Sequence, residues 1–140
     1  MLDWLARREH SRQEIYKKLL KKGSSETLAA EVVEQLAGEQ LISDERFMES
    51  LIRARRNRGY GPLRIHKELQ DKGVTAEAID RWLDVTGREW LEDIKRVQRK
   101  KFGGRIPKDY SERARQARFL QYRGFTYDQI QQILNLHGQD

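Results

Sequence analysis

The hydrophobic positions of this chain recur in three copies. Three glycines, Gly23, Gly73 and Gly124, are spaced 50 and 51 residues apart. Each follows an apolar residue by four positions and precedes an apolar pair by nine and ten positions. The pairs are Val32 with Val33, Trp82 with Leu83, and Ile133 with Leu134. Apolar residues at this spacing, without the alternation of strands, predict an all-α chain made of tandem copies of one unit.

The residues around each glycine predict a helix that ends, turns and begins again. A glycine just past a helix end adopts the left-handed conformation at low cost, and a cation before it suits the negative end of the helix dipole. A hydroxyl residue two positions later can cap the next helix. The cation and hydroxyl residue of each copy are Lys22 with Ser25, Lys72 with Thr75, and Arg123 with Thr126.

The helix before each glycine has its own start signal. Ser11 and Glu14 have the spacing of a capping box, and Gly61-Pro62 places proline at the first helical position. In the third copy, Ser111 follows a turn that contains proline and aspartate. These signals predict where the first helix of each pair begins.

A further helix precedes each pair. We expect it at residues 44–58 and 88–102, and only as a stub at residues 2–8. The chain is therefore predicted to hold three three-helix units, the first one shortened. Their expected boundaries are residues 1–42, 43–87 and 88–140.

The composition of the chain indicates its shape and the class of its partner. Charged residues make up 36% of the chain and hydrophobic residues 37%, which provides much surface for little core. We therefore expect an elongated, curved array of units. The 28 Lys and Arg against 22 Asp and Glu give a net charge of +6, which favours nucleic acid or another polyanion as partner.

Several classes of protein are disfavoured. The chain has no cysteine, so it has neither a disulfide framework nor a Cys-type zinc site. It shows no apolar run of the length of a signal peptide or a membrane span, so we expect a cytoplasmic protein without membrane contact. No long heptad pattern indicates a coiled coil, and we expect a monomer.

Catalysis has little support in the sequence. His10, His66 and His137 lie far apart, and no HExxH, nucleophile elbow or GxGxxG motif occurs. We expect no catalytic residues, no metal and no cofactor.

Several motifs resemble those of the bacterial RecX family. Residues 53–73 read RARRNRGYGPLRIHKELQDKG, residues 43–47 read SDERF, and residues 118–125 read RFLQYRGF. The opening stretch REHSRQEIYKKLLKKG is similar to the first unit of that family. The resemblance implies a non-enzymatic modulator of the RecA recombinase. Such a protein binds RecA and the groove of its filament on single-stranded DNA, with double-stranded DNA as a further candidate. It inhibits filament extension, ATP hydrolysis and strand exchange.

Clusters of cations are the candidate contact surface with DNA or the filament. Cations three residues apart on a helix share one face, as Arg53 does with Arg56, and Arg64 with Lys67. The full set of predicted contact residues is Arg53, Arg56, Arg58, Arg64, Lys67, Lys95, Arg99, Lys100, Arg113, Arg115 and Arg118.

Other features favour a structural interpretation. The helix-end position of Lys22, Lys72 and Arg123 explains these cations without a ligand. The RGYGP segment lacks the Gly-Lys-Ser/Thr of a phosphate-binding loop and is interpreted as architecture. Trp82 stands where the other copies have aliphatic residues, so we expect it in the core.

Two alternative functions remain open. The chain could be a tandem three-helix DNA-binding protein that reads duplex sequence without a RecA role, although the third helix of each unit is its more acidic part. It could also be a helical-repeat adaptor with no nucleic-acid role, whose binding would be insensitive to salt.

Overall fold

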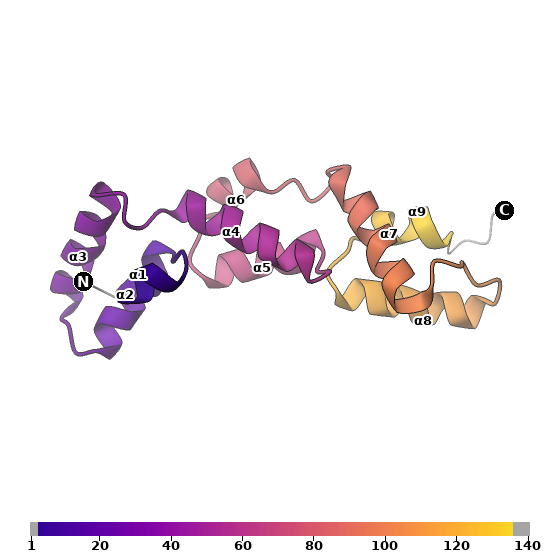
Figure 1. Ribbon diagram of the computed structural model, residues 1–140, viewed down its shortest axis with the longest axis horizontal. Helices are drawn as coiled ribbons and strands as arrows, with labels where there is room; N and C mark the ends of the chain where they lie inside the picture. Colours follow the sequence, from indigo (N-terminus) through magenta and orange to yellow (C-terminus); the bar gives the residue numbers. More distant parts are fainter. Residues whose placement is uncertain (1–2, 136–140) are drawn as a thin grey trace. The chain divides into compact units, whose positions relative to one another are not determined.

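All regular secondary structure in the described part of the chain is helical. The computed structural model describes residues 3–135, and its helices fall into three groups of three (Figure 1). The first group is α1 (Asp3–Arg7), α2 (Arg12–Lys21) and α3 (Glu26–Gly38); the second is α4 (Asp44–Asn57), α5 (Pro62–Asp71) and α6 (Ala76–Trp82); the third is α7 (Glu89–Phe102), α8 (Tyr110–Tyr122) and α9 (Tyr127–Leu134). The predicted all-α fold of three three-helix copies, the first one shortened, is confirmed.

The predicted helix boundaries are explained by local hydrogen bonds. Ser11 and Glu14 form the expected capping box at the start of α2, and Thr126 and Gln129 form a second one at α9. The Ser25 side chain accepts a hydrogen bond from the Leu28 N–H at the start of α3. Gly23, Gly73 and Gly124 have φ angles of 104°, 88° and 103°, which are left-handed conformations. The helix–turn–helix prediction is therefore confirmed in each copy.

The start of α8 differs from the prediction. Asp109, not Ser111, is its N-cap, and the Asp109 carboxylate accepts a hydrogen bond from the Ser111 N–H at 3.2 Å. Ser111 lies inside the first turn. The prediction placed Asp109 in the turn before the cap. Asp109 is itself the cap, because a short carboxylate side chain can accept the hydrogen bond as well as a hydroxyl group can.

Trp82 is not a core residue, which corrects the prediction made from its aliphatic counterparts. Its exposed fraction is 45%, whereas Leu83 is 5% exposed and Ile79 is fully buried. Trp82 is the last residue of α6 and Leu83 follows the helix, so of this apolar pair it is the second member that is buried. Val33 and Leu134, the second members of the other apolar pairs, are buried in the same way.

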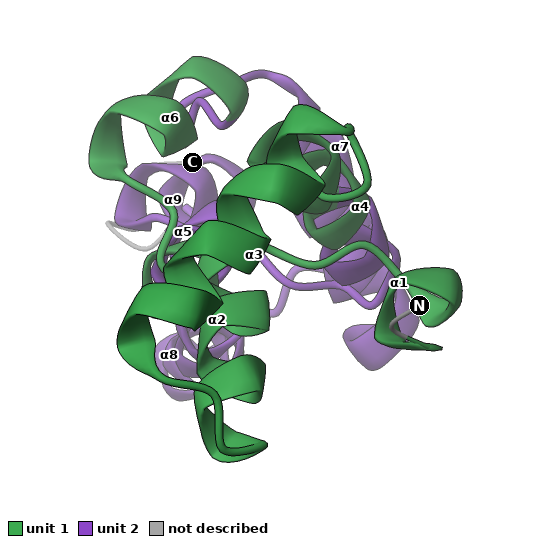
Figure 2. Ribbon diagram, turned by 90° about the vertical axis from the view of Figure 1, so that its left-hand side faces the viewer, with its two compact units in different colours: residues 1–52, 68–82 green, residues 53–67, 83–140 purple. Residues whose placement is uncertain are grey.

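The described chain divides into two compact units that cut across the sequence copies (Figure 2). Unit 1 contains the residues up to Ile52 together with Glu68–Trp82, and unit 2 contains Arg53–Lys67 together with the residues from Leu83 onward. In unit 1, a cluster of Ile15, Val33 and Ile42 forms part of the core. In unit 2, α7, α8 and α9 pack on one another and bury apolar residues that include Trp90, Ile94, Leu120 and Leu134.

The same junction between successive copies occurs once in each unit. In unit 1, the Ser11 hydroxyl at the start of α2 donates to the Lys72 carbonyl at the end of α5, at 2.8 Å. In unit 2, the Gly61 N–H before α5 donates to the Arg123 carbonyl at the end of α8, at 2.7 Å. Lys72 and Arg123 are equivalent positions of the repeat. The start of the second helix of one copy therefore docks on the turn of the next copy.

Close backbone contact explains the RGYGP segment at this junction. A Cβ atom on Gly61 would lie 2.5 Å from the Gly124 carbonyl carbon, and the Leu63 N–H donates to the Gly124 carbonyl at 2.9 Å. Pro62 begins α5, as predicted. These contacts support the architectural interpretation of the segment.

Candidate nucleic-acid interface

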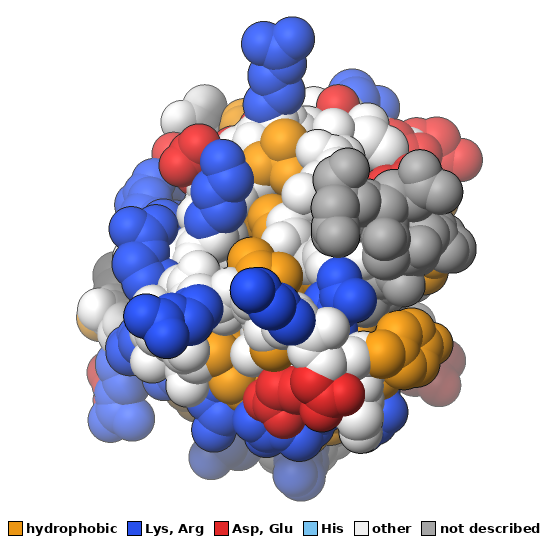
Figure 3. All heavy atoms as spheres, turned by 90° about the vertical axis from the view of Figure 1, so that its right-hand side faces the viewer, with side chains coloured by type: hydrophobic (Ala, Val, Ile, Leu, Met, Phe, Trp, Pro, Cys, Tyr) orange, Lys and Arg blue, Asp and Glu red, His pale blue; other side chains and the backbone are white. Residues whose placement is uncertain are grey.

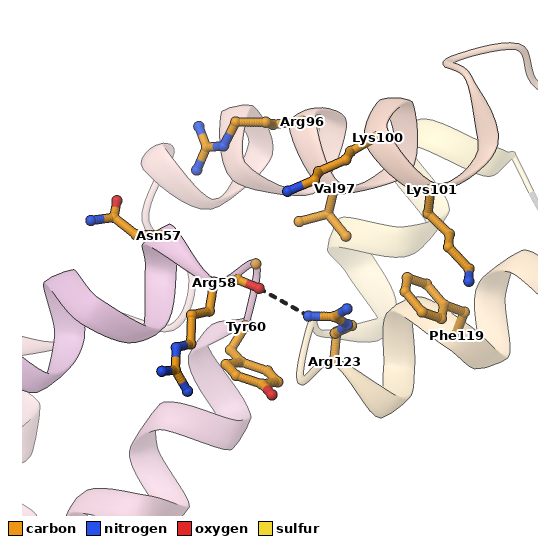
Figure 4. A pocket seen from close by; sticks show the side chains of 10 residues that line it. Asn57, Arg58, Tyr60, Arg96, Val97, Lys100, Lys101, Phe119 and Arg123 are labelled. Carbon is orange, nitrogen blue, oxygen red and sulfur yellow. Dashed lines mark hydrogen bonds between the residues drawn. The ribbon is translucent and has the colours of Figure 1, made fainter.

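Unit 2 carries a groove of about 620 Å³ whose walls come from the segment after α4, from α7 and from the end of α8 (Figure 4). We call it the basic groove. Its lining residues are Asn57, Arg58, Gly59, Tyr60, Arg96, Val97, Lys100, Lys101, Phe119 and Arg123. Five of these carry a positive charge and none of them is acidic. A hollow with this charge raises the local concentration of anions such as phosphates.

The cations come from elements that are distant in the sequence. Arg96 and Lys100 are four residues apart and lie on one face of α7, with Lys101 next to them. Arg58 lies on the opposite wall, in the turn between α4 and α5, and Arg123 follows α8. An anion in the groove would therefore meet positive charge from more than one side.

Arg123 ties the walls of the basic groove together. Its Nη1 atom donates to the Arg58 carbonyl at 2.9 Å, the contact drawn as a dashed line in Figure 4. Its guanidinium carbon lies 5.2 Å from the ring centre of Tyr60 and 5.1 Å from that of Phe119. Phe119 also packs edge-to-face on Phe102 at 5.4 Å. These contacts hold two rings and one guanidinium in fixed positions, as cation–π pairs do.

The floor of the basic groove requires glycine. Gly59 has a φ angle of +86°, and a Cβ atom there would lie 3.2 Å from Cγ2 of the buried Val97. The left-handed conformation disfavours other residues, and the contact leaves little room for a side chain. Gly59 thus lets the turn approach α7 closely.

A buried carboxylate anchors cations beside the basic groove. Asp93 of α7 is 2% exposed and accepts hydrogen bonds from Arg56 at 2.7 and 3.1 Å and from Arg96 at 2.9 Å. The hydrogen bond to Asp93 raises the pKa of Arg56 above its usual value. Arg56 also lies 5.2 Å from the centre of the Trp90 ring. The guanidinium of this predicted contact residue is therefore already engaged inside unit 2.

A second groove lies along another face of α7. Lys95 and Arg99 line it together with Ile106 and with Ile133 of α9, and its volume is about 530 Å³. The basic run of α7 therefore forms two stripes, each with residues four apart, that border two different hollows. The sequence predicted Lys95, Arg99 and Lys100 as one cluster, whereas the structure assigns Lys100 to the other groove.

The remaining predicted contact residues lie outside the basic groove. Arg64 stacks over Tyr60 at 4.1 Å and over Tyr122 at 5.3 Å. Arg115 pairs with Glu112 at 2.6 Å, and Arg113 donates to the Asn135 carbonyl at 3.2 Å. The other three are exposed on their helices: Arg53 on α4, Lys67 on α5 and Arg118 on α8.

Sequence reasoning missed some groove residues. It did not select Arg96 or Phe119, and it left Arg123 out of the predicted contact residues because the end of a helix explains a cation there. Arg123 does end α8, as predicted, but its side chain also lines the basic groove. The spacing of Arg96 with Lys100 was a usable signal. The pairing of Arg123 with Arg58, which are 65 residues apart, had no local signal.

Lys and Arg side chains cover much of one face of the molecule. Figure 3 views the end that carries α7, α8 and α9, where blue cationic side chains are numerous and hydrophobic and some acidic side chains lie among them. Such a mixture of cations and apolar groups is typical of surfaces that bind nucleic acid.

Residues 3–135 give little support for a metal site or a membrane-spanning helix. No group of three or more metal-ligating side chains gathers there, and no helix in this range is long and apolar enough to cross a bilayer. His10 is buried and contacts the Arg8 carbonyl, and desolvation lowers its pKa. His137 and residue 2 of the predicted N-terminal stub lie outside the described residues.

The fold and the groove define a class: a tandem three-helix-repeat protein with a basic binding surface. Three family models match the chain in order, namely the first, second and third three-helix domains of RecX, at residues 1–36, 43–83 and 88–134. The chain therefore belongs to the RecX family.

Similar proteins agree with this assignment. The chain is 41% identical to a regulatory protein RecX of Pseudomonas fluorescens, over 99% of this chain and 90% of the relative. It is 42% identical to a regulatory protein RecX of Ectopseudomonas mendocina, over 95% of this chain and 89% of the relative. These relatives are named as regulatory proteins.

Solved structures share the fold. A crystal structure of a regulatory protein RecX matches with a TM-score of 0.75 at 22% identity, over 96% of this chain and 68% of that one. RecX from Lactobacillus salivarius matches with a TM-score of 0.73 at 23% identity, over 97% and 91% of the two chains.

Proposed function

We propose that this chain binds RecA and the filament that RecA forms on single-stranded DNA, and that it inhibits the activities of the filament. Membership of a family of regulatory proteins supports a role in regulation. The observation that carries the proposal further is the basic groove, with five cations and no acid among its lining residues. A RecA–DNA filament is a large polyanionic partner of the kind that such a surface favours.

The regulator would act by binding and not by chemistry. A chain that occupies a filament can block the addition of subunits and the motions that accompany ATP hydrolysis, without a catalytic group of its own. We propose that the basic groove and other exposed cations of the chain provide contacts with the filament. These cations are Arg53, Arg64, Lys67, Lys95, Arg99 and Arg118.

Arg56, Arg113 and Arg115 are weaker candidates than their charge suggests. Each already holds a partner at 3.2 Å or less: Asp93, the Asn135 carbonyl and Glu112, respectively. A contact with the filament would have to compete with these bonds, and breaking the pair with buried Asp93 would be costly.

The test is a titration of RecA with this protein. We expect the DNA-dependent ATPase and strand exchange of RecA to fall at stoichiometric or lower ratios of this protein to RecA. If both activities persist at such ratios, the proposal fails. Strong preference for one duplex sequence in a competition assay would instead favour the tandem DNA-reading alternative.

The third helix of each unit gives little support to the alternative that this chain reads the sequence of duplex DNA. The α9 helix contains no Lys or Arg, and α6 contains only Arg81 beside Glu77 and Asp80. A helix that enters the major groove normally carries side chains for phosphates and base edges. The cations of this chain lie mainly on the other helices.

A further inference from the structure

We propose that the second groove, which Lys95 and Arg99 of α7 border, receives helix α3 from a second copy of this chain. The contact joins unit 1 of one chain to unit 2 of another. It covers two of the cations proposed above to contact the filament, so one chain cannot use them for both purposes at once. The inference does not rest on inhibition of RecA, because self-association is measured with the purified protein alone.

The second groove combines positive charge with apolar surface. Lys95 and Arg99 are four residues apart, so they lie on one face of α7, about one turn from each other. Ile106, which is 40% exposed, and partly buried Ile133 supply apolar side chains to the same hollow of about 530 Å³. None of the lining residues is acidic or aromatic. A segment with both a carboxylate and an aliphatic side chain matches this lining, because the isoleucines gain from burial only against another apolar group.

Contacts within unit 2 fix the shape of the second groove. Gln98 of α7 is 3% exposed, and its amide nitrogen donates to the Arg105 carbonyl and to Oε1 of Gln116, both at 3.2 Å. These bonds hold the segment after α7 against the helix. A Cβ atom on Gly104 would lie 3.3 Å from Cγ of Arg99, so the stem of Arg99 lies against this glycine. A groove whose walls are already held together loses little conformational entropy when a helix binds.

Helix α3 carries the matching surface. It contains three glutamates and no Lys or Arg. Leu28 is 50% exposed, and exposed Glu31, three residues later, lies on the same face of the helix. One face of α3 therefore offers a leucine to the isoleucines of the groove and a carboxylate to its cations. Apolar contact and charge complementarity both favour α3 as the occupant.

No other helix in residues 3–135 offers this combination. The α9 helix also lacks Lys and Arg, but it forms a wall of the groove through Gln132 and Ile133. Each of the remaining described helices contains at least one cation. Every chain has one such groove and one α3, so two chains can form two equivalent contacts in a two-fold dimer. The monomer expected from the sequence rested on the absence of a heptad pattern, which does not bear on a single helix in a groove.

Sedimentation equilibrium of the purified chain measures the association. The protein is studied from about 10 to 500 µM, at about 50 mM and about 500 mM salt. We expect the weight-average mass to rise with protein concentration at low salt. At high salt it should stay closer to the mass of one chain, because salt screens exposed charges.

Charge reversal identifies the two surfaces. Glu31→Lys brings a cation to the cations of the groove, and Arg99→Glu brings a carboxylate to Glu31. Each variant alone should therefore associate on the order of tenfold more weakly than the wild type. The control is Glu26→Lys, because Glu26 lies on the same helix but on a different face from Leu28 and Glu31. The control should stay close to the wild type.

An equimolar mixture of the Glu31→Lys and Arg99→Glu chains gives the sharpest result. Between unlike chains, one contact is the native charge pair and the other is the reversed pair, so the mixture should recover association close to that of the wild type. An unfolded variant, or a contact within one chain, would not recover on mixing. A wild type that stays monomeric, a mixture that does not recover, or equal weakening by the Glu26→Lys control would overturn the inference.

Discussion

Glu14 is a charged group whose environment makes it part of the structure of unit 1. It is 9% exposed, accepts hydrogen bonds from Arg8 at 2.8 Å and from the Ser11 N–H at 3.1 Å, and pairs with Lys72 at 3.2 Å. Burial alone would raise its pKa. The hydrogen bonds from Arg8, Ser11 and Lys72 outweigh this effect and lower the pKa to about 2. The ionised carboxylate thus holds the start of α2 to the end of α5.

Acid should weaken unit 1 through this residue. Because the pKa of folded Glu14 lies below its usual value of 4.5, the stabilisation is fully present above pH 4.5. It is lost as the pH falls toward 2. We expect Glu14→Gln to reduce the free energy of unfolding by about 2–3 kcal/mol at pH 7 and by much less at pH 2.5, measured by urea denaturation. A loss of the same size at both pH values would contradict this role.

Single residues also mark the limits of prediction from sequence. The caps Ser11, Ser25 and Thr126 were predictable because capping depends on neighbours within a few residues. The exposure of Trp82 was not predictable, because the pattern does not show which member of an apolar pair is buried. The anchoring of Arg56 by Asp93 joins residues 37 positions apart in the sequence, which no local pattern encodes.

At the scale of elements, the turn glycine of each copy differs in its surroundings. A Cβ atom on Gly23 would meet nothing within 4 Å, whereas one on Gly124 would lie 2.5 Å from Cβ of Arg64 and 2.8 Å from its backbone nitrogen. Gly23 therefore serves only the left-handed turn after α2. Gly124 serves the turn and also receives the start of α5, and the repeat pattern alone does not distinguish these roles.

Alanine substitution should separate the two roles. Gly23→Ala should cost about 1–2 kcal/mol, because only the left-handed conformation opposes the side chain. Gly124→Ala should cost about 1–3 kcal/mol more, because the backbone of α5 must also move. Thermal denaturation of both variants and the wild type measures the difference. Equal losses would show that the close contact at Gly124 carries no strain.

At the scale of the whole molecule, three copies and a thin core predict an elongated array. A compact chain of this length should have a radius of gyration of about 14 Å. We expect small-angle X-ray scattering in solution to give a value clearly above this. A value near 14 Å would contradict the expected shape.

The candidate site was less predictable than the fold. The order of the helices and most of their ends, the start of α8 excepted, were predictable because they depend on local pattern, and the basic run of α7 was visible in the sequence. The division of that run between two grooves follows from which faces of α7 meet α8, α9 and the turn at Gly59. These contacts belong to the tertiary structure, so the sequence indicated a basic surface but not its boundaries.

The most direct test of the central claim is the ATPase of RecA on single-stranded DNA, titrated with three forms of this protein. The wild type and a control variant, Arg105→Gln with Lys108→Gln, should inhibit at stoichiometric or lower ratios. The control removes the same charge from two exposed cations between α7 and α8, outside the basic groove. The Arg58→Gln, Lys100→Gln variant should need on the order of tenfold more protein, because it lacks two groove cations. Equal inhibition by all three forms, or none by the wild type, would contradict regulation of RecA through the basic groove.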